Sequence, residues 1–226
     1  GKLAAFDAAT GKPLWTQPKA GGGNSSPVAW KSADKTVVLC NGRGTLAGVD
    51  LKSGEVLWTT PGGGDCTPAI VGDVLAVQTN KASVGILAGK LSATGFQQLW
   101  NIPYDPLRSQ SSPLIIGEHV YVMDDGVHWC IDLASGREVW KEKVGASAIS
   151  SPACADGKVF LLASGGAKLL MLKPSPEKYT LLAKANARAL SCPSPAIADG
   201  KLLVRGRKGI TCYELPAGAG SVAKHP

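Results

Sequence analysis

Short apolar runs alternate with polar or glycine-containing turns along most of the chain. One segment shows the pattern clearly, with four successive apolar or β-branched runs at residues 27–30, 36–40, 45–51 and 55–60. The second and third runs are separated by Asn-Gly-Arg-Gly at residues 41–44, a strong signal for a β-hairpin. Runs of this length joined by tight turns predict antiparallel strands. This segment is therefore expected to form one four-stranded antiparallel sheet.

The segment is one copy of a longer repeat. Each copy has a Ser-Pro or Thr-Pro step before its first strand, and an Asp-x-x-Thr/Ser-Gly turn followed by a strand that ends in Trp. The turn and Trp positions are Asp7, Gly11, Trp15, Asp50, Gly54, Trp58, Asp132, Gly136 and Trp140, with a degenerate copy, lacking the Asp, at Gly95 and Trp100. The Trp residues recur every 40–43 residues and the prolines every 39–45. A period of about 40–45 residues made of short strands is typical of a β-propeller blade.

The predicted fold class is all-β: a β-propeller of four-stranded antiparallel blades, about five of which are present. In each turn the Asp can accept backbone N–H bonds, and the Gly can adopt the positive φ that the reversal needs. The Trp is large and apolar and has one N–H to place. We expect it to pack against the neighbouring blade; stacking on a carbohydrate is the alternative.

The repeat also carries a family resemblance. Ala-x-Asp-x-x-Thr-Gly-Lys-x-x-Trp at residues 5–15 resembles the tryptophan-docking motif of quinoprotein propellers, the PQQ-like repeat family. The resemblance covers nearly the whole chain and implies the fold more than the function. The family includes alcohol and glucose dehydrogenases that bind pyrroloquinoline quinone, a non-enzymatic lipoprotein of the outer-membrane barrel-assembly machinery, and other bacterial propellers. Its complete members have seven or eight blades.

The predicted strands divide the chain into blades. We place a partial blade at residues 1–25, blades at 26–64, 65–110, 111–149 and 150–191, a partial blade at 192–215 and a loose tail at 216–226. In a five-blade ring closed by the chain ends, residues 2–6 would duplicate the strand at 210–214. The chain is therefore interpreted as a partial propeller whose N-terminal blades are missing.

Composition narrows the function classes. The 28 Gly and 15 Pro fit many short strands and tight turns. The net charge of +7 points weakly to acidic partners, since many Lys and Arg lie in turns where solvation explains them. The chain has no polybasic tail and no nucleic-acid motif, no apolar run of the ~18 residues that a membrane span needs, and no signal peptide.

Six cysteines could form three disulfides. In the aligned repeats Cys130, Cys154 and Cys212 replace small or apolar strand residues, so they are predicted to be buried and unbridged. Cys66 and Cys192 precede first strands that lie two blades or more apart, and we do not pair them. The chain has no C-x-x-C, so a zinc site is not indicated.

No catalytic constellation is evident. The histidines are His119, His128 and His225, and none has a Ser or Cys at a recognisable nucleophile spacing. Asp124 and Asp125 precede a Gly and are interpreted as a hairpin turn, with calcium as the alternative.

The resemblance itself implies a further comparison, because the cofactor-binding enzymes of the family use an adjacent Cys–Cys pair, a calcium ion and an Asp base. No two cysteines are adjacent here, and only 9–12 residues separate each Trp from the next repeat proline. Active-site elaborations normally need longer loops. No catalytic residue, cofactor or metal is therefore predicted; pyrroloquinoline quinone and calcium belong only to the alternative.

One face of the propeller is the better candidate for binding. Because strands alternate in direction, the second turn of each blade and the connector between blades should open on the same face. The candidates on it are Tyr104, Asp105, Arg108 and Gln110 from the longest connector, and Arg43, Arg205 and Arg207 from hairpins. Loops on a rigid scaffold usually carry function. A solvated connector without a role is the alternative.

The function favoured by the sequence is a non-catalytic binding scaffold, extracytoplasmic or periplasmic in a bacterium as the resemblance implies. Its partner is expected to be a protein, with a polysaccharide as the other possibility. The alternatives are a fragment of a quinoprotein dehydrogenase and a carbohydrate- or polymer-binding accessory module.

Overall fold

The computed structural model describes residues 1–105, 110–124, 126–144, 150–190 and 192–215. The candidates Arg108, Asp125 and His225 and the tail at 216–226 lie outside these ranges. The described residues form 21 β-strands in six antiparallel sheets, which we number as blades I to VI. The all-β propeller fold predicted from the repeat is confirmed.

Blade I is a pair of strands, β1 (Leu3–Phe6) and β2 (Pro13–Gln17). Blade II contains β3 (Val28–Lys31), β4 (Thr36–Asn41), β5 (Thr45–Asp50) and β6 (Val56–Pro61). Blade III contains β7 (Ala69–Val71), β8 (Val74–Gln78), β9 (Ile86–Ser92) and β10 (Gly95–Ile102). Blade IV contains β11 (Leu114–Ile116), β12 (His119–Asp124), β13 (Val127–Asp132) and β14 (Glu138–Lys143). Blade V contains β15 (Ala153–Ala155), β16 (Lys158–Ala163), β17 (Lys168–Lys173) and β18 (Thr180–Asn186). Blade VI contains β19 (Ala196–Ala198), β20 (Lys201–Arg205) and β21 (Ile210–Glu214).

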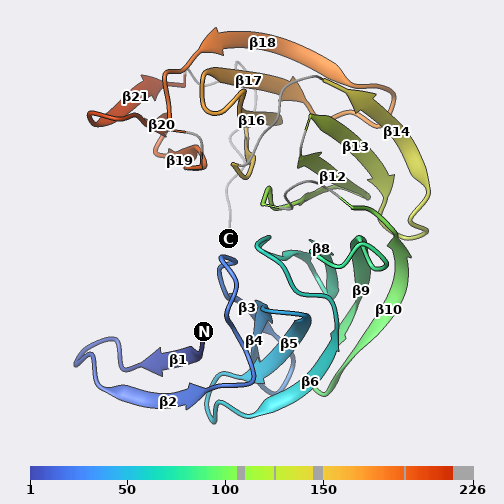
Figure 1. Ribbon diagram of the computed structural model, residues 1–226, viewed down its shortest axis with the longest axis vertical. Coiled ribbons are helices and arrows are strands. Elements are labelled where there is room, and N and C mark those ends of the chain that lie inside the picture. The colour runs from blue at the N-terminus through green and yellow to red at the C-terminus, as the bar shows by residue number, and fades with distance from the viewer. Residues whose placement is uncertain (106–109, 125, 145–149, 191, 216–226) are drawn as a thin grey trace.

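The blades follow one another around a common centre (Figure 1). The fourth strands of the complete blades, β6, β10, β14 and β18, run along the periphery, and blades I and VI stand at the two ends of the arc. Within each blade, consecutive strands pair as simple antiparallel neighbours, and side-chain packing between blades joins one sheet to the next. This is the quasi-modular arrangement that repeat proteins use.

The core lies between blades, and the alternation along each middle strand creates it. On β13, Trp129 and Ile131 join a buried cluster with Trp100 of blade III, whereas Cys130 joins a cluster with Leu161 of blade V. The middle strands are therefore buried on both faces, unlike strands of a sheet with one solvated side.

The repeat Trp residues join successive blades. Trp15 Nε1 donates to the Leu51 carbonyl oxygen of blade II at 2.9 Å, and Trp100 Nε1 donates to Leu133 O of blade IV at 2.8 Å. Each acceptor belongs to the Asp-x-x-Thr/Ser-Gly turn of the next blade. A Cβ on the turn residue Gly54 would lie 2.5 Å from the Trp15 ring, so glycine is required there by the docked indole as well as by its φ of +75°.

Two docking sites depart from this pattern. Trp140 Nε1 donates at 2.9 Å to Ser175 O, in the stretch of blade V where the turn motif is eroded. Trp58 meets the degenerate copy in blade III, where β9 and β10 are joined by a two-residue turn. Its ring stacks on Phe96 at 5.6 Å, and its N–H finds no acceptor among the described residues. Trp30, which is outside the predicted motif, donates to Gly72 O at 2.9 Å.

The cysteines require a correction. Cys130 is buried as predicted, but Cys154 and Cys212 are exposed. Cys154 lies on β15, a three-residue strand at the inner end of its blade, and Cys212 lies on β21, all of whose residues are exposed. Cys212 occupies the same repeat position as the buried Cys130, but its blade stands at the end of the arc (Figure 1). All three thiols are free.

Candidate functional site

Hairpin turns and connectors meet on one face of the arc. Gly64 N in the connector after β6 donates to Gly42 O in the β4–β5 turn at 3.0 Å, and Asn80 N in the β8–β9 turn donates to Gly63 O at 2.7 Å. The same arrangement recurs further along the chain, where Ala189 N donates to Gly166 O at 2.9 Å. The connectors after β6 and β18 therefore pass between the second turns of two successive blades.

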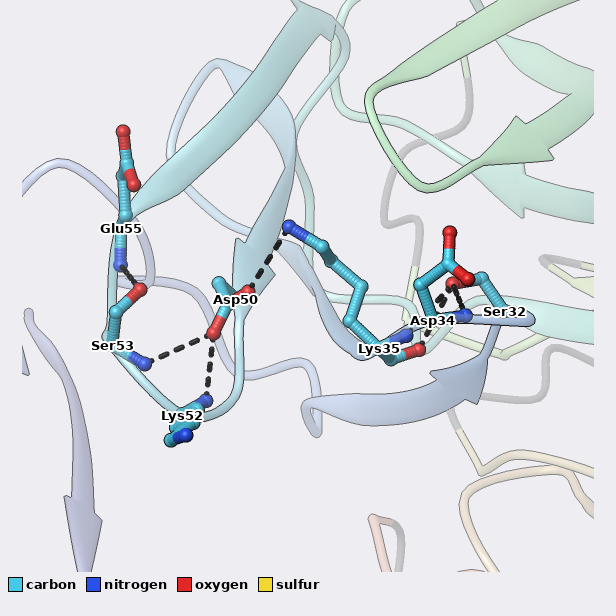
Figure 2. Close-up of polar contacts among 7 residues, drawn as sticks. All are labelled: Ser32, Asp34, Lys35, Asp50, Lys52, Ser53 and Glu55. Carbon is cyan, nitrogen blue, oxygen red and sulfur yellow. Dashed lines mark hydrogen bonds and ion pairs between the residues drawn. The ribbon is translucent and has the colours of Figure 1, made fainter.

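The opposite face carries the Asp turns, and these are internally satisfied. Figure 2 shows Asp50 accepting the backbone N–H groups of Lys52 and Ser53 at 2.9 and 3.0 Å on Oδ1, while Lys35 Nζ lies 3.4 Å from Oδ2. The N–H of Ser53 and then the other contacts lower the pKa of Asp50 below its usual value. Hydrogen bonds from Thr10 and Ser135 likewise lower the pKa of Asp7 and of Asp132. These three carboxylates stabilise their own turns, and no further role is needed to explain their presence.

The connector after β10 places its candidate residues differently. Tyr104 is half-buried: its ring lies 5.0 Å from the ring of Trp129 in blade IV, and Lys141 Nζ lies 3.7 Å above that Trp. Asp105 is exposed. Gln110 is half-buried and lines the central pocket described below. Tyr104 therefore anchors the connector, and Asp105 faces solvent.

The basic candidates are exposed but not gathered in one place. Arg43 lies in the β4–β5 turn, where its Nε donates to Gly22 O at 2.8 Å. Arg205 ends β20 and Arg207 lies in the turn that follows. Blades II and VI stand apart on the arc, so the structure does not bring Arg43 together with the other two (Figure 1).

The connector face also carries a glycine-lined trough that sequence reasoning missed. It has a volume of about 520 Å³ and lies between the turns of β4–β5 and β8–β9. Its lining comes from three Gly-rich segments and from Asn24, Arg43, Asp65, Asn80 and Lys81. Its glycines come from three separate segments, at 21–23, 42–44 and 62–64, and only the packing of blades brings these segments together.

A chain of hydroxyl groups joins the inner ends of the blades. The backbone N–H of Thr67 donates to Ser112 Oγ at 2.9 Å, that of Ser112 to Ser151 Oγ at 3.1 Å, and that of Ser151 to Ser194 Oγ at 2.9 Å. Ser26 N begins the series by donating to Thr67 Oγ1 at 3.0 Å. The residue before each repeat proline thus links neighbouring blades, a role that the recurring Ser-Pro step signals but does not specify.

These hydroxyls line a central pocket of about 340 Å³ together with Asn24, Asp65, Gln110 and Cys192. Among the described residues its one carboxylate is Asp65, which accepts the backbone and side-chain N–H of Asn24 on Oδ1, both at 3.1 Å. A calcium ion is held by six or more oxygens, carboxylates among them, and a single carboxylate with one oxygen already engaged is a poor match for it. We derive no redox step from it.

The described residues offer little further chemistry. His128 is fully buried, and desolvation lowers its pKa to about 4. Across the ranges that the structure describes, no group of three or more His, Cys, Asp or Glu side chains could hold a metal ion. In the same ranges no helix is long and apolar enough to cross a membrane.

Comparisons with known proteins agree with the fold. The structure of BamB from Moraxella catarrhalis aligns with 96% of this chain, at 16% identity and a TM-score of 0.67, and the alignment spans 65% of the BamB chain. The structure of BBS1N, solved in complex with ARL6DN, aligns with 97% of this chain, at 11% identity and a TM-score of 0.68, and the alignment spans 74% of the BBS1N chain. A europium-containing methanol dehydrogenase aligns over 57% of this chain and 25% of its own, at 18% identity and a TM-score of 0.44. A sequence comparison with curated proteins found no match.

The family comparison is decisive for membership. The profile described as outer membrane protein assembly factor BamB matches residues 1–148 and 129–223, which together span nearly all of the chain. The chain therefore belongs to the PQQ-like β-propeller family described by that name.

Proposed function

We propose that this chain is a non-catalytic scaffold that binds a partner protein outside the cytoplasm. The observation that carries the proposal is the family match, whose description is that of an outer membrane protein assembly factor. The chain spans 65% of the length of the BamB structure, so the role of that whole protein is a proposal for this one.

The connector face is the proposed contact surface. In the Asp turns of the opposite face, Oδ1 of each carboxylate accepts N–H groups of its own turn, whereas Asp105, Arg43, Arg205 and Arg207 are exposed on the connector side. Exposed polar groups on loops held by a rigid scaffold are available to a partner. Tyr104 supports this surface from beneath by packing on Trp129, and Gln110 adds a polar group at its inner edge.

The experiment uses a photo-activatable amino acid in the intact protein in its native host. It replaces Asp105 on the connector face in one strain and Lys52 on the opposite face in another, and both residues are exposed. The proposal expects a discrete protein adduct from position 105 and none from position 52. Adducts of equal yield at both positions, or at position 52 alone, would contradict it.

A second measurement addresses the absence of catalysis. The purified protein is supplied with pyrroloquinoline quinone, calcium, a redox dye and a series of alcohols and sugars. The proposal expects dye reduction no faster than in the protein-free control. Substrate-dependent reduction above that control would assign the chain to the quinoprotein dehydrogenases.

A further inference from the structure

The trough on the connector face has a floor of bare backbone. A Cβ on Gly63 would lie 2.2 Å from Gly44 N, and one on Gly42 would lie 2.5 Å from Gly21 O. Gly63 also has a φ of +87°. Close packing of the connectors against the β4–β5 turn therefore excludes side chains from the floor, and the trough stays open.

Two cations line this floor. Arg43 stands on the β4–β5 turn and Lys81 on the β8–β9 turn, with the connector at 62–64 between them. The bond from Arg43 Nε to Gly22 O fixes the guanidinium and leaves its two terminal amino groups for another acceptor. Among the described residues, no carboxylate forms an ion pair with either cation.

The acid and amides of the trough define the rest of its chemistry. Among the described residues, Asp65 is the only carboxylate that lines the trough, and Asn24 donates to one of its oxygens. The side chains of Asn24 and Asn80 offer both donors and acceptors along the walls. The charged lining is thus two cations to one anion, in a protein whose net charge is +7.

We propose that the trough binds an extended acidic segment of a partner protein, with a carboxylate between Arg43 and Lys81. The inference deepens the proposed scaffold function and rests on it. A guanidinium fixed at its Nε favours bidentate binding of a carboxylate. A glycine floor lets a peptide backbone approach closely, and the two carboxamides can pair with its N–H and C=O groups. The part of the lining that the structure describes has no aromatic ring on which a nucleobase or sugar could stack.

The test measures fluorescence polarisation of a labelled hexaglutamate peptide with the intact protein at low salt. The double variant Arg43→Gln/Lys81→Gln is compared with Lys12→Gln/Lys52→Gln, which removes the same charge from exposed positions on the opposite face. The proposal expects a Kd raised about tenfold or more by the first pair, as for loss of a charge-assisted contact, and changed less than about twofold by the second. Thermal melts establish that both variants fold.

Several outcomes would overturn the inference. Equal loss of hexaglutamate affinity in both double variants would show that the peptide responds only to the net charge of the protein. Displacement of the peptide by inorganic phosphate at matched charge would make the trough a site for small anions. Equal affinity for an oligothymidylate, lost in the Arg43/Lys81 variant, would assign it to nucleic acid. No binding of hexaglutamate by the wild type, with the adduct from position 105 retained, would refute the trough and leave the scaffold function standing.

Discussion

Replacing His128 by Phe should remove a large part of the acid sensitivity of this protein. His128 lies on β13 between Met123 of β12 and Glu142 of β14, and its ring is 5.5 Å from that of Tyr179 in blade V. Its side chain is fully buried, and neither ring nitrogen has a hydrogen-bond partner among the described residues. A protonated imidazole in this position would be an unpaired buried charge.

The magnitude follows from the pKa. Burial lowers the pKa of His128 from 6.5 to about 4, so the unfolded chain binds this proton at a higher pH than the folded chain does. The free energy of unfolding therefore falls as the pH drops from about 6.5 toward 4, by up to about 1.4 kcal/mol per pH unit and about 3 kcal/mol in all. Above pH 6.5 the contribution is constant.

The assay is urea unfolding followed by Trp fluorescence at several pH values between about 7.5 and 4.5. Comparison with His128→Phe isolates the His128 contribution from that of the carboxylates, whose lowered pKa values act at lower pH. His119→Gln, which removes an imidazole at a partly exposed position, is the matched control. Parallel loss of stability in the wild type and His128→Phe would show that the imidazole is not held neutral in the folded protein.

Three further predictions concern stability and redox state. Trp58→Ala should cost about 3–5 kcal/mol in denaturant melts, as large-to-small core substitutions do, and Trp15→Ala should cost less because blade I has two strands; similar small effects at both sites would show that these residues do not join blades. Gly136→Ala should cost about 1–3 kcal/mol more than Gly117→Ala, because both have positive φ but only the first Cβ, 2.6 Å from the docked indole, is overpacked; equal costs would mean that the indole moves aside freely. Mass mapping under non-reducing conditions should find no intramolecular disulfide at Cys130, Cys154 or Cys212. A bridge at any of these three cysteines would contradict the structure.

The fold was accessible from the sequence because the features that define a blade are local. The hairpin signal at residues 41–44 lies between β4 and β5, and the Asp50 turn lies between β5 and β6. Strand pairing, turn chemistry and the position of Trp58 within β6 are all set within about 35 residues of chain. Repetition of that unit then predicts a propeller, since one sheet cannot bury both of its faces alone.

The candidate site was accessible only in outline. The sequence places turns and connectors on the same face, but it treats Tyr104 as a free contact residue, whereas the structure packs it on Trp129 of the next blade. It assigns burial to Cys154 and Cys212 by analogy with aligned positions, whereas both are exposed. The trough between Arg43 and Lys81 and the buried, unpaired imidazole of His128 have no sequence signature of their own.

The sequence by itself therefore determined what happens inside a blade, and the tertiary structure decided what happens between blades. The hydrogen bond from Thr67 N to Ser112 Oγ joins residues 45 positions apart, and that from Trp15 to Leu51 joins residues 36 apart. Such contacts depend on how far one sheet is rotated and offset against the next, which no local pattern encodes. Whether a side chain is buried, engaged or open to a partner is fixed by that packing, because the same repeat position meets a different neighbour in each blade.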